Sequence, residues 1–388
     1  MIKFGQFICA LLVRAVFICC IVTPAFGKVF VYVSAADDGK IAIFEMDPET
    51  GDLTAAGKAG AGKMVMPLAA SPDRRFLYAS IRSSPYSVAS FALDSATGAL
   101  TLLSTVPLPD NMAYISTDRT GRFLLSASYA GDVVGVNPIG NRGSVRKDPV
   151  QVLPTGRHAH AILTDPSNRF AYVPNLGSDQ VMQLLFAGDT GILTPGEPGA
   201  VRTPAGSGPR HFCFAPSGKF VYLINELNGM VYVYALDAGT GQLKEVGEIS
   251  AVPRGARLVP GKPRAAIGAE AAGASAEPDR TDWIWCADIH ITPDGKFLYA
   301  SERTTSTLAA FSVDPRTGKL TYLGSFDTET QPREFQIGPR GNFLICAGQK
   351  SGRISVHQIN RETGELTRIK RYEAGGDPGW VEIVDFPE

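Results

Sequence analysis

Charged and polar side chains recur at two positions of a repeated sequence pattern. Counting ten residues back from six regularly spaced phenylalanines gives Met66, Ala113, His160, Arg210, Ala287 and Arg333. The segments that follow these phenylalanines add Arg82, Tyr129, Asn175, Asp179, Asn225, Glu226, Glu302, Arg303, Gln349 and Lys350. Guanidinium groups, a few carboxylates and an imidazole suit an anionic or polyhydroxylated ligand and acid–base chemistry.

The pattern that carries these residues is a sevenfold repeat. Its marker phenylalanines are residues 30, 76, 123, 170, 220, 297 and 343, with a usual spacing of 46 to 50 and one spacing of 77. A turn motif of the form Asp-x-x-Thr-Gly keeps the same period and begins at Asp47, Asp94, Asp237, Asp314 and, as a variant, Asn360. Periods of this length with short strands predict an all-β, seven-bladed β-propeller.

One repeat can be divided completely into strands and turns. Residues 210–215, 220–225, 230–236 and 243–249 each alternate as a strand, and Pro, Ser, Gly and Asn occupy the intervening turns. The C-terminal segment from Trp380 to Val384 resembles a first strand and should complete the first blade, which lacks one. We therefore expect the C-terminal strand to close the ring. The long spacing contains an insertion at about residues 250–282, read as a loop.

Strand order within a blade places the variable polar residues together. The recurring turns all fall on one face of the ring, where their repetition is structural. The first-strand starts and the second-to-third-strand turns meet on the opposite face, at one mouth of the central channel. The insertion joins two blades on that face, so it should overhang the mouth.

The N-terminus predicts export. Lys3 precedes an apolar stretch over residues 7–22 that Arg14 interrupts, and small residues end it at Gly27. This pattern is typical of a signal peptide (residues 1–27) that is cleaved to leave a propeller over residues 28–388 in the periplasm. The alternative, an uncleaved membrane anchor, is disfavoured because Arg14 leaves too short an apolar run.

The amino-acid composition argues against nucleic acids and membranes as partners. The chain has 37 Lys and Arg against 38 Asp and Glu, so the basic excess of a nucleic-acid-binding protein is missing. No apolar run after residue 27 is long enough to span a membrane, and we expect a monomer. Three cysteines lie after residue 27, namely Cys213, Cys286 and Cys346. We expect them to be small residues of the core and do not expect a disulfide scaffold.

Five segments carry a family resemblance: residues 208–211 (GPRH), 225–228 (NELN), 285–295 (WCADIHITPDG), 330–333 (TQPR) and 348–352 (GQKSG). They resemble the bacterial propeller-type 6-phosphogluconolactonase family, which is related to fungal propeller enzymes that make or open muconolactones. The resemblance extends over about residues 28 to 388. It implies a seven-bladed propeller, hydrolysis of a lactone ring, and active-site positions for His160, Arg210, Glu226 and Arg303.

The residue types agree with that activity. Lactone hydrolysis needs a base for water, stabilisation of an oxyanion and a proton for the ring oxygen. We expect Glu226 to be the base, Arg210 to stabilise the oxyanion and His160 to donate the proton or share the base role. The expected substrate-binding residues are Arg303, Arg333, Asn225, Asp179 and Lys350. No metal or other cofactor is expected, because no His or Cys ligand spacing supports one.

Several alternatives remain open. Glu226 and Arg210 could form a structural ion pair, His160 could be a hydrogen-bonded channel residue, and a divalent metal could bind near Glu226 and Asp179. The leader favours glucono-1,5-lactone, which an exported enzyme would meet, over 6-phosphogluconolactone of the pentose phosphate pathway. A muconate cycloisomerase and a non-enzymatic binding propeller are the other functional alternatives.

Overall fold

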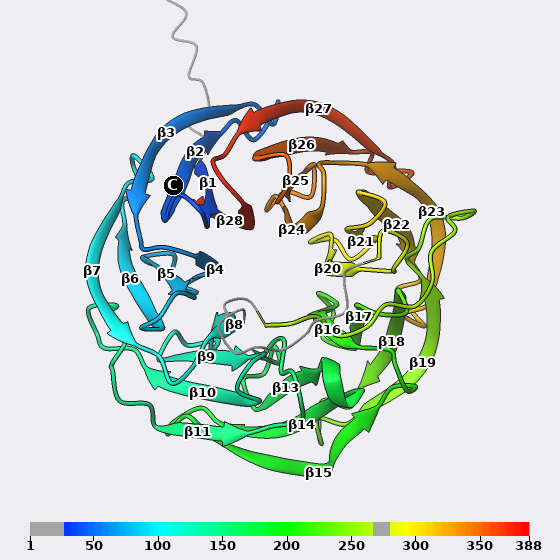
Figure 1. The fold of residues 1–388 in the computed structure, drawn as a ribbon, viewed down its shortest axis with the longest axis horizontal. Coiled ribbons are helices and arrows are strands. Elements are labelled where there is room, and N and C mark those ends of the chain that lie inside the picture. Colours follow the sequence, from blue (N-terminus) through cyan, green and yellow to red (C-terminus); the bar gives the residue numbers. More distant parts are fainter. Residues whose placement is uncertain (1–26, 267–279, 388) are drawn as a thin grey trace, which may run out of the picture.

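The protein is a ring of seven four-stranded antiparallel sheets around a central axis (Figure 1). The structure, a computed structural model, describes residues 27–266 and 280–387. The predicted signal peptide therefore lies almost wholly outside the described residues. Within them, no helix is long and apolar enough to cross a bilayer.

Each blade runs from an inner to an outer strand. In the first three the order is β28 (Pro378–Phe386), β1 (Lys28–Ala35), β2 (Lys40–Met46), β3 (Leu53–Gly60); β4 (Val65–Ala70), β5 (Phe76–Ile81), β6 (Ser87–Leu93), β7 (Leu100–Pro107); and β8 (Met112–Thr117), β9 (Phe123–Ser128), β10 (Val133–Pro138), β11 (Gln151–Pro154). The fourth has β12 (Leu163–Thr164), β13 (Phe170–Asn175), the short 3₁₀ helix η1 (Leu176–Ser178), β14 (Gln180–Ala187) and β15 (Ile192–Arg202).

The last three blades repeat this order: β16 (Pro209–Phe214), β17 (Phe220–Asn225), β18 (Met230–Leu236), β19 (Leu243–Ser250); β20 (Cys286–Ile291), β21 (Phe297–Glu302), β22 (Thr307–Val313), β23 (Leu320–Asp327); and β24 (Pro332–Ile337), β25 (Phe343–Gly348), β26 (Arg353–Ile359), β27 (Leu366–Glu373). The strands expected for the repeat at 210–249 are confirmed as β16 to β19, within one residue at each end.

The two repeated motifs are two halves of one contact between neighbouring blades. Each marker phenylalanine lies against a glycine in the turn between the third and fourth strands of the next blade, and in five blades this glycine ends an Asp-x-x-Thr-Gly-type turn. A Cβ on Gly98 would come within 2.3 Å of the Phe30 ring, and one on Gly241 equally close to Phe170. Gly98 and Gly241 have φ of 70° and 75°, a region that favours glycine. The same pairing occurs in all seven blades, so the ring is held by neighbour-to-neighbour contacts.

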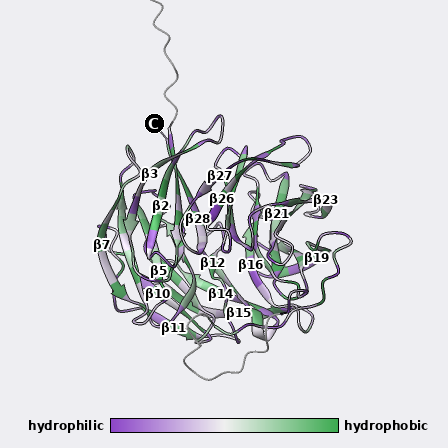
Figure 2. Cartoon of the chain, turned by 45° about the horizontal axis from the view of Figure 1, so that its top comes forward, coloured by the Kyte–Doolittle hydropathy of each residue, from purple (hydrophilic) through white to green (hydrophobic). Residues whose placement is uncertain are grey.

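Hydrophobic side chains fill the spaces between blades. One cluster joins Phe30 and Tyr32 of β1 to Leu77 of β5 and Phe91 of β6, all buried. Figure 2 shows the same division, with hydrophobic residues concentrated in the strands and hydrophilic ones in the connections. Cys286 and Cys346 are buried and Cys213 is partly buried, and all three are free, as expected.

The ring is closed by its two ends, as predicted. Strand β28 pairs antiparallel with β1, from Lys28 opposite Phe386 to Ser34 opposite Trp380. Figure 1 shows these segments side by side at the inner end of one blade.

Removal of residues 380–388 should therefore destabilise the whole ring. It would expose the inner edge of β1 and the apolar surface that Trp380 and Val381 cover, both of which are buried. We expect a lower Tm in a thermal melt and a larger aggregated fraction in size-exclusion chromatography. An unchanged melt and elution volume would contradict closure by this strand.

Candidate active site

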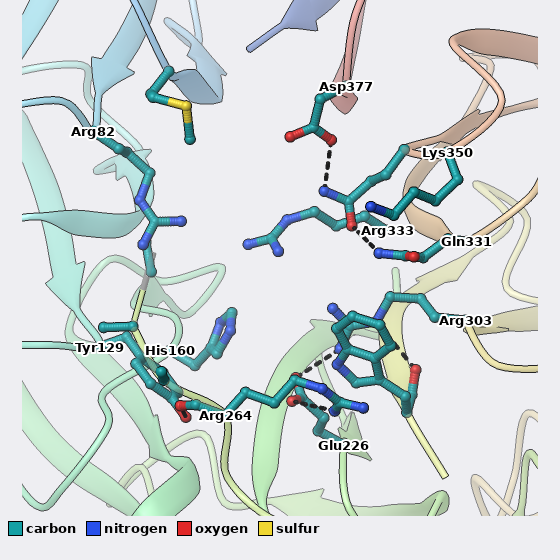
Figure 3. Close-up of a pocket in the computed structure, with 16 residues that line it drawn as sticks. Arg82, Tyr129, His160, Glu226, Arg264, Arg303, Gln331, Arg333, Lys350 and Asp377 are labelled. Atoms are coloured by element: carbon teal, nitrogen blue, oxygen red, sulfur yellow. Dashed lines mark hydrogen bonds and ion pairs between the residues drawn. The ribbon is translucent and has the colours of Figure 1, made fainter. Parts of the chain in front are cut away.

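A cavity of about 490 Å³ opens at one end of the central axis (Figure 3). Much of its lining comes from the positions that the repeat predicted, namely the residues just after the second strands of several blades and the starts of their inner strands. The main lining side chains are Arg82, Tyr129, His160, Glu226, Arg264, Arg303, Gln331, Arg333, Lys350 and Asp377. A cavity of this size holds a small molecule.

Glu226 is surrounded by guanidinium groups. Its Oε2 lies 2.9 Å from Arg210 Nε and 2.8 Å from Arg303 Nη2, and its Oε1 lies 3.9 Å from Arg264 Nη1. Burial alone would raise the pKa of this carboxyl, but the charges of Arg303, Arg210 and Arg264 outweigh it and lower the pKa below the usual 4.5. Glu226 is therefore an ionised carboxylate at neutral pH.

Arg210 contacts Glu226 from within the protein and does not line the cavity. Its side chain is fully buried, Nε donates to Glu226 Oε2 and Nη1 donates to the carbonyl of Ala287. A guanidinium in this place orients the carboxylate and compensates its charge.

His160 extends its ring into the cavity (Figure 3). Burial, assisted by the charge of Arg210, lowers the pKa of the imidazole well below its usual 6.5. The ring is thus neutral at neutral pH. It can accept a hydrogen bond through its unprotonated nitrogen, but it does not carry the extra proton of an imidazolium. Its Nδ1 is buried and has no hydrogen-bond partner among the described residues.

The side of the cavity away from Glu226 carries two further arginines, Arg82 and Arg333. Arg82 and Arg333 extend toward each other across the opening (Figure 3), and Arg82 Nε donates to Asn111 Oδ1 over 2.8 Å. Burial, together with the charge of Arg333, lowers the pKa of Arg82 to about 9. Burial, together with the charge of Arg210, lowers the pKa of Arg333 to about 10. Within the described residues, neither forms an ion pair.

The described lining is strongly cationic. Five of its side chains are Arg or Lys and two, Glu226 and Asp377, are carboxylates. Asp377 is engaged, since its Oδ1 accepts a hydrogen bond from Gln349 Nε2 at 2.8 Å. An anionic group is the natural occupant of the Arg82–Arg333 side, since it would relieve the repulsion between the two guanidinium groups.

The expected substrate-binding residues divide into two groups. Arg303, Arg333 and Lys350 line the cavity. Asp179 and Asn225 do not. Asp179 accepts hydrogen bonds from the backbone amides of Gly206 and Gly208, at 2.8 and 2.9 Å, and Asn225 Nδ2 donates to the carbonyl of Met230 at 2.8 Å. These two side chains hold loops, and the structure places them outside the cavity lining.

Several lining residues were missed, among them Arg264, Trp285, Gln331 and Asp377. Asp377 directly precedes the inner strand β28, as Gln331 precedes β24, and so lies two residues before the position at which the repeat rule places Arg333 in its own blade. Arg264 lies in the insertion, which the sequence predicts to be a loop that overhangs the mouth, without assigning any of its side chains to the site.

A cluster of protonatable groups includes His211, Asp288 and Glu334, whose ligand atoms lie within 4.8 Å of one another. Asp288 already accepts hydrogen bonds from His211 and His290, each at 2.9 Å. Although burial opposes it, the charge of Asp288 raises the pKa of His290 to about 10, and burial raises the pKa of Glu334 well above 4.5. Two histidines therefore already engage Asp288 in this cluster, and independence from metal stays a prediction.

Comparison with known proteins decides the family. The model of a family described as "Lactonase, 7-bladed beta-propeller" matches residues 30–383. The chain belongs to this lactonase family. The family places the lactonase among the carboxylic ester hydrolases and excludes the non-enzymatic propeller.

Individual relatives agree. The lactonase is 38% identical over 354 residues to a 6-phosphogluconolactonase of Pectobacterium carotovorum, covering 91% of this chain and 98% of that protein. It is 37% identical to a 6-phosphogluconolactonase of Serratia proteamaculans, with coverage of 92% and 99%. Among solved structures it is similar to the periplasmic gluconolactonase of Pseudomonas aeruginosa, with 26% identity, a TM-score of 0.79 and coverage of 94% and 100%.

Proposed function

We propose that this lactonase hydrolyses the ring ester of an aldono-1,5-lactone that carries an anionic group, namely 6-phosphoglucono-1,5-lactone. The observation that carries the proposal is the Arg82–Arg333 pair, which faces the cavity without an ion-pair partner among the described residues. A phosphate bound there would direct the lactone ring toward Glu226. The relatives at 36 to 38% identity carry the same substrate in their name.

The chemistry we propose begins with a water molecule between Glu226 and His160. The ionised carboxylate takes one proton through Oε1, and the neutral imidazole accepts the second hydrogen as a hydrogen bond, which orients the water. The water oxygen bonds to the lactone carbonyl carbon, and guanidinium groups that line the cavity beside Glu226 stabilise the resulting oxyanion. When the bond between this carbon and the ring oxygen breaks, Glu226 returns its proton to that oxygen.

Arg210 is assigned a positioning role in this scheme. It is fully buried and contacts Glu226 Oε2, so it acts on the reaction through the carboxylate. The oxyanion role expected for it from the sequence passes to groups that line the cavity.

Glucono-1,5-lactone is the second candidate, and a different observation favours it. The leader-like residues 1–27 indicate export, and the similar Pseudomonas aeruginosa enzyme is a periplasmic gluconolactonase. In this alternative the protein acts in the periplasm and the arginine pair binds hydroxyl groups and the product carboxylate. Cell fractionation, with N-terminal sequencing of the mature protein, tests the export and the cleavage after Gly27.

Kinetics on the two lactones, corrected for spontaneous hydrolysis, test the substrate. We expect a higher kcat/KM for the 6-phosphate, and Arg333→Gln should lower that kcat/KM by about 10- to 100-fold because one charge-assisted contact is lost. The same variant should change the rate on the unphosphorylated lactone much less. Arg316→Gln, at an exposed turn, is the control. Equal losses on both lactones would favour glucono-1,5-lactone.

A further inference from the structure

The described first part of the insertion, residues 251–266, is a built part of the cavity wall, which we call the strap. It leaves β19 in one blade and reaches a residue two blades away. Gly261 donates its amide hydrogen to the carbonyl of Leu227 at 2.8 Å, and Tyr129 Oη donates to the carbonyl of Arg264 at 2.8 Å. These contacts fix the backbone on both sides of the Arg264 side chain.

The side chain of Arg264 is fixed as well, by an aromatic ring. Its guanidinium carbon lies 3.5 Å from the centre of the Trp285 ring, and that of Arg303 lies 3.9 Å from the same centre. Two cations this close to one ring must occupy its opposite faces, so Trp285 lies between them. A guanidinium stacked on an aromatic face keeps its N–H groups directed outward in the plane, where they can contact a ligand.

The three arginines near Glu226 differ in what they present to the cavity. Arg210 is fully buried. The side chain of Arg303 is 2% exposed. Its Nε and Nη2 donate to the carbonyls of Trp285 and Cys286, and its Nη2 forms an ion pair with Glu226. The side chain of Arg264 is 16% exposed, lines the cavity and lies 3.9 Å from Glu226 Oε1.

We propose that Arg264 is the oxyanion-stabilising residue of this site and that the strap is a working part of the catalytic machinery. The inference rests on the proposed lactone hydrolysis. As water adds to the carbonyl carbon beside Glu226 Oε1, negative charge develops on the carbonyl oxygen. The Arg264 guanidinium, held on Trp285, is placed to bind that oxygen while Glu226 holds the proton.

The test compares Arg264→Gln with Arg257→Gln, an exposed arginine of the same strap. Loss of an oxyanion donor costs about 10²–10³ in kcat, and we expect that loss for Arg264→Gln with little change in KM. Removal of a cation near Glu226 should also raise the pKa of that carboxyl, so the acid limb of the kcat profile should move to higher pH. Arg257→Gln should behave as wild type in both measurements.

The variants also separate this inference from the proposed function. Wild-type protein without activity on either lactone would overturn both. An active wild type together with an Arg264→Gln variant of normal kcat, or one altered in KM alone, would overturn the role of Arg264 only. Arg264→Lys keeps the charge but not the planar stack, and partial recovery of kcat is expected. Equal melting curves establish that the variants are folded.

Discussion

Replacement of Glu226 by Gln is expected to lower kcat by about 10²- to 10⁴-fold, which is the usual contribution of a general base. The amide keeps the shape of the carboxylate and can still accept from Arg210 and Arg303, but it cannot take a proton from water. Steady-state kinetics on the preferred lactone, after subtraction of spontaneous hydrolysis, measure the effect.

Glu245→Gln on β19 is the matched control, because Glu245 is exposed in the same blade. It should leave kcat unchanged. A folded Glu226→Gln variant that loses only substrate affinity would show that another group activates the water.

The same carboxylate sets the acid limit of activity. Since the pKa of Glu226 lies below 4.5, the base stays ionised and kcat should hold until the pH falls below that value. Its contribution to stability has the same sign, being present above pH 4.5 and lost as the pH falls through the native pKa. Burial places the pKa of the His160 imidazole well below 6.5, so this side chain should not add a titration near neutrality.

Replacement of Arg210 by Met should give the largest loss of stability. Breaking a buried ion pair by removal of one partner costs about 3–5 kcal/mol, and we expect the lower end because Arg303 still contacts Glu226. Urea unfolding measures the change in the free energy of unfolding. Arg210→Lys keeps the charge but not the fork that contacts both Glu226 and Ala287, so it should be intermediate in stability and turnover.

A double variant, Arg210→Met with Glu226→Gln, tests the pairing directly. If the two side chains stabilise each other, the double variant should lose less stability than the sum of the single variants. Additive losses would show that Arg210 acts on the fold independently of Glu226. Arg316→Gln is again the control and should be neutral.

The fold was predictable because the sequence of nearly every blade repeats the same marker residue and turn motif. The marker phenylalanines and the Asp-x-x-Thr-Gly-type turns meet across the blade boundaries, so a sequence period became a structural contact. The site was predictable as far as strand order places residues at one mouth, which located His160, Glu226, Arg303 and Arg333. Strand order did not show which side chains line the cavity, because Asp179 and Asn225 occupy mouth positions but bind backbone groups. The position of a residue along a strand does not show whether its side chain binds a nearby backbone group or faces the cavity.

Arg264 was beyond the reach of this reasoning for a different reason. The insertion has no counterpart in the other repeats, so no period predicts where its side chains lie. Its place depends on Trp285 and Tyr129, which are far from it in sequence and reach it only in the folded ring.

The pairing of β28 with β1 brings the two ends of the described chain together in one blade. The position of the chain ends is therefore set by the connectivity, and the arrangement of the seven blades does not require it. Since Lys28 and Phe386 are partners in one sheet, a short linker could join these ends, and the chain could instead be opened at another inter-blade connection. Every contact between neighbouring blades would survive such a circular permutation, including those of the blade that now carries the seam. The order in which the blades emerge during synthesis could thus be changed independently of the cavity that they surround.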